Sequence, residues 1–280
     1  MADTLHPCCD PASPSPIWVG KSTGKIITID NIETYIARPR QTTGKSSADK
    51  RVLLHLTEGH SIYFLNAQLL ADSFATHLNC DVIMPDQFRG QERVPKATVP
   101  HFPEGKVEVP PPSAEHILPP YHKSQTEEDF EIWKKAHEPP VTDPLLETVV
   151  QYIRRTYGED VKIWGVGYCF GGRYIMRLMG SGVIDVGVVN HPSFYTLDEV
   201  GQLGGKKLAI YAAETDNIQT PELRRATEDV LTRVGATWTS TVFSGTHHGF
   251  SVRGDLNIKM VRLAKDRAFR GAVEWFRDWL

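Results

Sequence analysis

The sequence predicts an α/β fold with a mostly parallel central sheet and helices on both faces. Apolar runs of strand length alternate with segments of helical period along most of the chain, and such alternation implies right-handed crossovers between parallel strands. Runs such as RVLLHLTE (51–58) are apolar nearly throughout, as in strands that are covered on both faces. We expect one domain over residues 25–280, preceded by a Pro/Ser-rich arm at 1–24.

The first half of the chain supplies four expected strands and one helix. GKIITIDNIETYIARP predicts two strands joined at Asp30–Asn31, a pair of residues that favours a tight hairpin. The strand at 51–58 follows. A helix comes next, because the apolar residues of FLNAQLLADSFATHLN share one helical face. CDVIMPDQF then predicts a short strand that ends at Pro85–Asp86.

The second half resumes the alternation. DPLLETVVQYIRRTYG predicts a helix with Asp143 as N-cap, Pro144 at the first position and Gly158 near the end. The remaining expected elements are VKIWGVGY (strand), GGRYIMRLMG (helix), VIDVGVVNH (strand), KKLAIYAAETD (strand), TPELRRATEDVLTRVG (helix), TWTSTVFSG (strand) and an amphipathic helix at 256–280.

A Pro-rich insertion at about 90–142 interrupts this alternation. Long irregular insertions in compact domains are usually either functional or disordered. We interpret this one as a cap over the active site, and a solvated excursion is the alternative. Its aromatic and apolar residues disfavour pure disorder.

Composition narrows the function classes. The chain has 280 residues and a net charge of −3, with no basic stretch interleaved with aromatics and no apolar run of membrane-spanning length. We expect no nucleic-acid partner, no membrane, no metal and a small-molecule substrate, with a monomer or homodimer. Four cysteines and no secretory signal favour a cytoplasmic protein without disulfides. Cys8–Cys9 is either half of a metal site or part of a flexible arm.

Residues 167–171, Gly-Tyr-Cys-Phe-Gly, fit the nucleophile-elbow pattern with Cys169 where serine is usual. The glycines keep a tight strand-to-helix turn free of Cβ clashes. The turn also places the thiol at a helix N-terminus, which favours the thiolate. The alternative is a buried structural cysteine in a Gly-rich turn.

Such a nucleophile needs an acid and then a histidine later in the chain. Asp216 follows the strand KKLAIYAAET, and Glu214 competes with it for the acid role. A histidine from GTHHGF, His247 or His248, follows the next strand. Carboxyl ends of parallel strands meet at one edge of a sheet, so these residues are expected to converge on Cys169.

These motifs together resemble the dienelactone hydrolase family of α/β-hydrolases. The resemblance rests on GYCFGG, ETD and HHGFSVRGD, with RVLLHLTEGHSIYFLNAQLLADSFA and DVIMPDQFRGQE in the earlier part. It covers the chain from about Ile26 to the C-terminal helix, and the layout is most similar to fungal members. The resemblance implies an α/β-hydrolase fold, a Cys169–His248–Asp216 triad and no cofactor.

The resemblance also implies further site residues. Glu58 stands where family members can carry a glutamate that contacts the resting thiol and helps to form the thiolate, and an ordinary polar residue at the end of a strand is the alternative. The oxyanion hole would use the backbone N–H groups of Phe170 and Gly59. The stretch EGHSIYF lacks the usual Ile/Phe-Gly step, which puts the second donor in doubt.

Four residues are candidates for substrate binding. Arg89 and Arg253 lie about one residue away from the family's carboxylate-binding arginines, and each has an ordinary surface arginine as its alternative. Tyr168 and His191 are expected to line the pocket, and a structural role for His191 is equally open.

Two functions fit this set of residues. The first is hydrolysis of a lactone, ester or thioester through a Cys169 acyl-enzyme, since thiolates suit activated acyl groups better than amides. The alternative is a natural-product enzyme that uses the same pocket for a lyase, isomerase or cyclase reaction, with His248 moving protons. A catalytically inactive binding protein is disfavoured by the intact triad residues.

Overall fold

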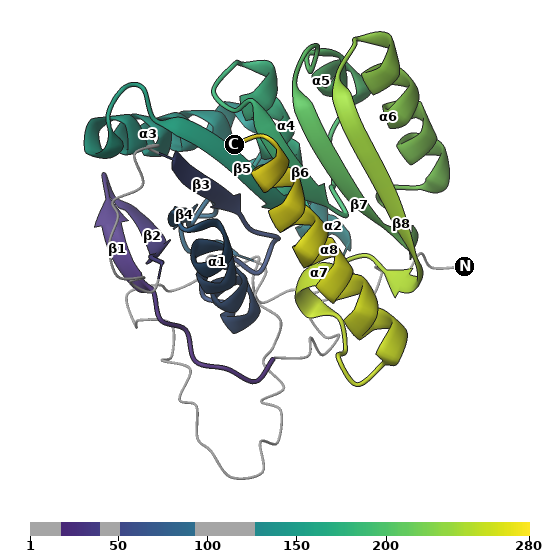
Figure 1. Ribbon diagram of the computed structural model, residues 1–280, viewed down its shortest axis with the longest axis horizontal. Coiled ribbons are helices and arrows are strands. Elements are labelled where there is room, and N and C mark those ends of the chain that lie inside the picture. Colours follow the sequence, from purple (N-terminus) through teal and green to yellow (C-terminus); the bar gives the residue numbers. More distant parts are fainter. Residues whose placement is uncertain (1–17, 40–50, 93–126) are drawn as a thin grey trace.

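A computed structural model describes residues 18–39, 51–92 and 127–280. Eight strands form one sheet in the order β1-β2-β4-β3-β5-β6-β7-β8 (Figure 1). Strands β3 to β8 run parallel, and β1 and β2 are antiparallel to their neighbours. The strands are β1 (Lys25–Ile29), β2 (Ile32–Ala37), β3 (Arg51–Leu56), β4 (Asp81–Pro85), β5 (Lys162–Tyr168), β6 (Val186–Asn190), β7 (Lys207–Thr215) and β8 (Thr237–His247).

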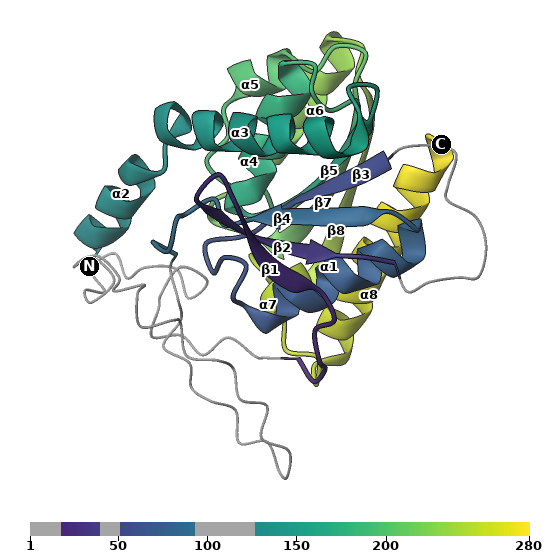
Figure 2. The same cartoon turned by 90° about the vertical axis from the view of Figure 1, so that its left-hand side faces the viewer.

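Helices cover both faces of the sheet, as Figure 2 shows most clearly. On one face lie α1 (Leu65–Leu78), α7 (Phe250–Arg253) and α8 (Lys259–Asp278). The other face carries α3 (Pro139–Tyr157), α4 (Phe170–Gly180), α5 (Leu197–Gly201) and α6 (Pro221–Arg233). Helix α2 (Glu127–Ala136) lies at the N-terminal end of α3. The predicted α/β class with a mostly parallel sheet is therefore confirmed.

Each face of the sheet has its own apolar core. One core joins Phe74 of α1 and Phe276 of α8 to strand residues such as Trp164. The other joins α3, α4 and α6 to the opposite side chains of the same strands. Because a strand that is buried on both faces must be apolar at every position, the central strands read as continuous hydrophobic runs in the sequence.

Most predicted elements lie where their patterns place them. The hairpin turns at Asp30 and Asn31, both with positive φ, as a two-residue turn of the type favoured between twisted strands requires. Thr220 caps α6 by accepting a hydrogen bond from the Leu223 N–H. The two short helices α5 and α7 have no counterpart among the predicted elements.

The predicted start of the helix at Asp143–Pro144 is wrong. Helix α3 begins at Pro139 with Glu138 as N-cap, so Pro144 lies inside the helix. Two prolines at the first helical positions give an equally good start five residues earlier, since proline there sacrifices no helical N–H bond. Asp143 instead pairs with Arg177 of α4.

Part of the predicted insertion can be placed. Residues 93–126 lie outside the described part of the chain, as does Cys8–Cys9. The end of the insertion, from Glu127 onward, forms α2 and the start of α3. Trp18, near the end of the predicted arm, packs into the core beside α1, and its backbone N–H donates to the side-chain oxygen of Asn66.

Candidate active site

Cys169 lies in the sharp turn between β5 and α4. Its backbone has φ 49° and ψ −112°, a conformation that costs roughly 1–3 kcal/mol for a residue with a side chain. Three hydrogen bonds between backbone groups hold the turn. The Cys169 N–H donates to the Asn190 carbonyl, the Ser193 N–H to the Cys169 carbonyl, and the Gly171 N–H to the Thr57 carbonyl. The ends of β3 and β6 thus fix the strained residue.

The two glycines of the elbow pattern are required by close backbone contacts. A Cβ on Gly167 would lie 2.5 Å from the Gly171 carbonyl oxygen, and one on Gly171 would lie 2.2 Å from that of Leu56. Both distances are far inside van der Waals contact. The turn brings Cys169 to the first turn of α4, where the positive end of the helix dipole favours an anion.

His248 and Asp216 form a buried pair beside the elbow. His248 Nδ1 lies 2.7 Å from Asp216 Oδ2. The other carboxylate oxygen accepts hydrogen bonds from the backbone N–H groups of Ile218 and Gln219. Asp216 therefore fixes the orientation of the His248 ring and leaves Nε2 as the nitrogen that faces the elbow.

Ser193 bridges the thiol and the histidine. Its hydroxyl donates to Cys169 Sγ at 3.1 Å and lies 3.3 Å from His248 Nε2. The side chain is fully buried. Ser193 lies in the loop after β6, so three neighbouring strands and the elbow contribute to one polar cluster.

The electrostatics of this cluster favour a charged His248. Burial opposes a charge on the ring, but the sulfur of Cys169 and the Asp216 carboxylate raise the pKa of His248 well above its usual value. Burial also opposes ionisation of Asp216, yet the hydrogen bond from His248 lowers the pKa of this carboxyl. These directions favour the imidazolium form of His248, held between the Asp216 carboxylate and the Cys169 sulfur.

His191 lies against the same cluster with the opposite tendency. Its ring contacts that of His248 with 4.9 Å between centroids, and its Nε2 lies 2.8 Å from Ser251 Oγ. Burial, followed by the charge of His248, lowers the pKa of His191 to about 3. The pKa values of the two adjacent histidines are thus shifted in opposite directions, with that of His248 raised and that of His191 lowered.

Glu58 contacts Arg253 and His60. Arg253 Nε donates to Glu58 Oε2 at 2.7 Å, and His60 Nδ1 lies 3.2 Å from Oε1. Burial would raise the pKa of Glu58, but these two neighbours lower it overall. The carboxylate oxygens of Glu58 thus each have a neighbour other than the thiol, and the contact of Glu58 with the thiol stays a prediction. Whether Arg253 binds substrate stays a prediction.

The other predicted site residues are distributed around the elbow. Tyr168 ends β5 and is buried against His55, with 5.1 Å between ring centroids. Phe170 begins α4, and Gly59 lies in the turn after β3, which the bond between Gly171 and Thr57 brings to the elbow. The oxyanion role of Phe170 and Gly59 stays a prediction. The Arg89 side chain is exposed, with φ 51° in its backbone.

Aromatic residues from α2 cover the start of α4. Trp133 contacts Phe88 and Phe170, with centroid separations of 5.3 and 5.5 Å. Trp133 Nε1 donates to the Gln91 carbonyl, and the His137 ring lies 4.8 Å from the Trp133 ring. The end of the predicted insertion therefore packs directly on the residue that follows Cys169.

The competing acid and histidine lie outside this cluster. Glu214 is exposed and accepts hydrogen bonds from Ser244 and from the Gly245 backbone at the end of β8. His247 is exposed, whereas His248 is buried. Ser193 and His60 were not among the predicted site residues. The one sequence signal for Ser193 is its position in the loop that follows a parallel strand, where active-site residues of such sheets gather.

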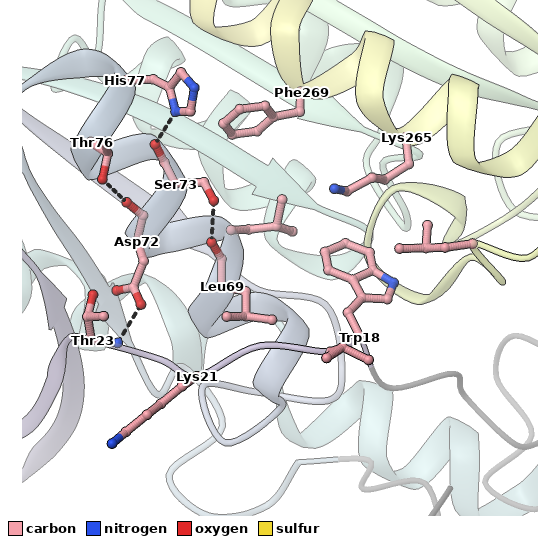
Figure 3. Close-up of a pocket in the computed structure, with 13 residues that line it drawn as sticks. Trp18, Lys21, Thr23, Leu69, Asp72, Ser73, Thr76, His77, Lys265 and Phe269 are labelled. Atoms are coloured by element: carbon pink, nitrogen blue, oxygen red, sulfur yellow. Dashed lines mark hydrogen bonds between the residues drawn. The ribbon is translucent and has the colours of Figure 1, made fainter. Parts of the chain in front are cut away.

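A separate groove lies away from the elbow. It has a volume of about 440 Å³ and lies between α1, α8 and residues 18–23, with Lys265 over the Trp18 ring (Figure 3). Asp72 on its wall accepts a hydrogen bond from the Thr23 N–H.

Within residues 18–39, 51–92 and 127–280, no group of three or more His, Cys, Asp or Glu side chains is arranged to hold a metal ion. None of the described helices is long and apolar enough to cross a membrane.

Solved structures share this fold. A crystal structure from Klebsiella pneumoniae superposes with a TM-score of 0.69 at 14% identity, covering 92% of this chain and 99% of that one. A dienelactone hydrolase from Anabaena variabilis superposes with a TM-score of 0.57 at 10% identity, covering 92% of this chain and 99% of that one. At these identities the likeness concerns the fold.

Sequence relatives are closer. The chain is 32% identical to the hydrolase pyvD of Aspergillus violaceofuscus over 98% of this chain and 96% of that one. It is 36% identical to the hydrolase tropI of Talaromyces stipitatus over 93% of this chain and 92% of that one. Residues 34–280 match the dienelactone hydrolase family. The chain therefore belongs to the dienelactone hydrolase family.

Proposed function

We propose that this protein is a hydrolase that cleaves a lactone, ester or thioester through a Cys169 acyl-enzyme. The observation that carries the proposal is the buried cluster at the elbow, in which Asp216 orients His248 and the Ser193 hydroxyl joins its ring to the thiol. Membership of a hydrolase family and two relatives named hydrolases support the same class of reaction.

The mechanism follows from the charges and the geometry. His248 receives the thiol proton, and the thiolate attacks the acyl carbon. His248 then protonates the leaving group and later activates water to hydrolyse the thioester. Backbone N–H groups at the start of α4 and in the turn after β3 would stabilise the oxyanion. Asp216 keeps the imidazolium oriented throughout.

The test compares the wild type with Cys169→Ala on p-nitrophenyl acetate and on a dienelactone. We expect the variant to lose activity by at least about 1,000-fold, since no other group replaces the nucleophile. Mass spectrometry of the quenched wild type should detect an acyl group on Cys169. The matched control is Cys80→Ala, because Cys80 is a buried thiol at the opposite end of the sheet.

Activity that survives Cys169→Ala would overturn the acyl-enzyme. If that surviving activity converts a substrate without hydrolysing it, the result would favour the alternative lyase, isomerase or cyclase chemistry. In that case His248→Ala should still abolish turnover, because the alternative depends on His248 as the group that moves protons.

A further inference from the structure

Ser193 occupies a position that the triad alone does not explain. Its hydroxyl lies 3.1 Å from Cys169 Sγ and 3.3 Å from His248 Nε2, and its side chain is fully buried. Its backbone N–H donates to the Cys169 carbonyl at 3.0 Å. The residue is therefore fixed to the elbow by its main chain, and its hydroxyl contacts both reacting groups, which are also in direct hydrogen-bond contact with each other.

The hydrogen-bonding capacity of a hydroxyl fits both charge states of the site. One hydroxyl donates one proton and accepts at its lone pairs. Since Asp216 holds Nδ1–H, the neutral ring of His248 presents an acceptor at Nε2. In the neutral state the thiol donates to Ser193 Oγ, which donates to Nε2. In the charged state Nε2–H donates to Oγ, and the hydroxyl donates to the thiolate.

We propose that Ser193 is the proton bridge between Cys169 and His248. The inference deepens the proposed function and rests on Cys169 being the nucleophile. The thiol proton passes to Ser193 Oγ while the hydroxyl proton passes to Nε2. The products are a thiolate, an imidazolium and a regenerated serine hydroxyl, so protons and electrons balance without a further reactant.

Other ionisable groups around the bridge are already paired or neutral. Asp216 holds the far side of the His248 ring, and Glu58 is paired with Arg253 and His60. Burial keeps His191, the remaining histidine against the ring, neutral across the working range, with a pKa of about 3. The thiol of Cys169 and the ring of His248 are therefore the two groups between which Ser193 can pass a proton.

The test measures how fast iodoacetamide alkylates Cys169 between about pH 4 and 9, a readout that needs no substrate. Alkylation is followed on the tryptic peptide 163–173, which contains Cys169 as its sole cysteine. The variants are Ser193→Ala, which removes the hydroxyl and keeps the backbone bond, and Ser193→Thr, which restores a hydroxyl. Ser251→Ala is the matched control, because this buried serine bonds His191 rather than the thiol.

We expect Ser193→Ala to move the midpoint of the alkylation profile upward by about one pH unit, because the thiolate loses a donor. Its kcat on p-nitrophenyl acetate should fall roughly tenfold or more with little change in KM. The dependence of kcat on the fraction of D2O should be curved in the wild type, where two protons move, and linear in Ser193→Ala. Ser193→Thr should restore the wild-type profile, and Ser251→Ala should not alter it.

An unchanged alkylation profile in a folded Ser193→Ala would overturn the bridge, even if kcat fell. Should Ser193→Thr fail to fold, the Ser193→Ala profile and its D2O dependence decide alone. Failure of the proposed function has a different signature, namely an enzyme that still hydrolyses ester after complete alkylation of Cys169.

Discussion

At the scale of single residues, Glu58 and Arg253 hold opposite charges out of solvent beside the site. Their side chains are 2% and 9% exposed, and His60 contacts the second carboxylate oxygen. A buried pair contributes little when compared with apolar side chains, but the removal of one partner leaves a buried charge. The pair should therefore matter to stability chiefly when it is broken.

Replacing Glu58 with glutamine should lower the free energy of unfolding by roughly 3–5 kcal/mol at neutral pH. The pKa of Glu58 is lower in the folded chain than its usual 4.5. Its contribution is thus complete above about pH 4.5 and declines as pH falls toward the lower folded value. Urea unfolding of wild type and Glu58→Gln at several pH values should show the difference narrowing in acid.

The control is Glu131→Gln, which removes an exposed carboxylate paired with Lys134 within one helix. Pairs of this kind contribute little, so its stability should match that of the wild type at every pH. A difference between wild type and Glu58→Gln that stayed constant from neutral to acid pH would contradict the assigned charge.

The residues that sequence could predict are those fixed by local sterics. Gly167 and Gly171 mark the elbow because backbone atoms leave no room for a Cβ, and this requirement is visible in a five-residue pattern. The contact between Ser193 and the thiol depends instead on how β6 lies beside β5. No local pattern encodes that distance, just as none encodes the pairing of Glu58 with Arg253.

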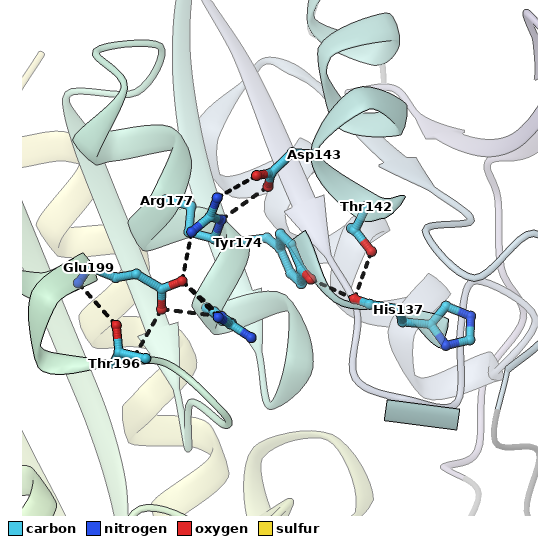
Figure 4. A network of polar contacts seen from close by, with 8 residues as sticks. His137, Thr142, Asp143, Tyr174, Arg177, Thr196 and Glu199 are labelled. Carbon is cyan, nitrogen blue, oxygen red and sulfur yellow. Dashed lines mark hydrogen bonds and ion pairs between the residues drawn. The ribbon is translucent and has the colours of Figure 1, made fainter. Parts of the chain in front are cut away.

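At the scale of elements, one ion-pair network joins α3, α4 and α5 (Figure 4). Glu199 of α5 accepts from Arg173 and Arg177 of α4 at 2.7–3.1 Å, and Arg177 continues to Asp143 of α3. Glu199 also completes a capping box with Thr196 at the start of α5. Tyr174 adds a separate tie, because its hydroxyl donates to the His137 carbonyl before α3.

A series at Glu199 should separate the two roles of this side chain. Glu199→Gln keeps a side chain that can complete the capping box and removes the charge, so it reports the ion pairs. Glu199→Ala removes both and should cost about 1 kcal/mol more in unfolding free energy, the usual contribution of a cap. Chemical denaturation measures both. Equal losses in the two variants would show that the capping box adds nothing.

The boundaries of elements were predictable only where the terminal signal was unique. Thr220–Pro221 offers one start for α6, and the helix begins there. The region before α3 offers two proline starts, and the contact of Asp143 with Arg177 is compatible with its lying inside the helix. Helix α5 is a single turn, too short for a periodic apolar pattern to reveal it.

At the scale of the whole molecule, the order of elements was predictable because each strand and helix has its own period. The convergence of Asp216, His248 and Cys169 follows from parallel topology, since each residue comes directly after a strand and parallel strands end at one edge. The aromatic cover from α2 was not predictable in the same way. Its contacts with Phe88 and Phe170 come from a segment whose irregular, Pro-rich sequence carries no period.

The two apolar cores share one sheet, so the domain should unfold as a single unit. Phe276 of α8 is fully buried and stacks on Trp164 of β5 at 5.2 Å, on the face opposite α3 and α4. Phe276→Ala should lower the unfolding free energy by about 3–5 kcal/mol, the usual cost of such a cavity. Strand β5 leads directly into the elbow, so the loss should extend to the opposite face and to Cys169.

The measurement is urea unfolding followed by far-ultraviolet circular dichroism, tryptophan fluorescence and the alkylation rate of Cys169. All three should give one midpoint in the wild type and a common, lower midpoint in Phe276→Ala, because coincident transitions are the mark of a two-state domain. Leu280→Ala, at an exposed position beyond α8, should leave the midpoint unchanged. Separate midpoints, with Cys169 still protected after the α8 face has unfolded, would instead mean that the faces are independent units and that the sheet does not couple them.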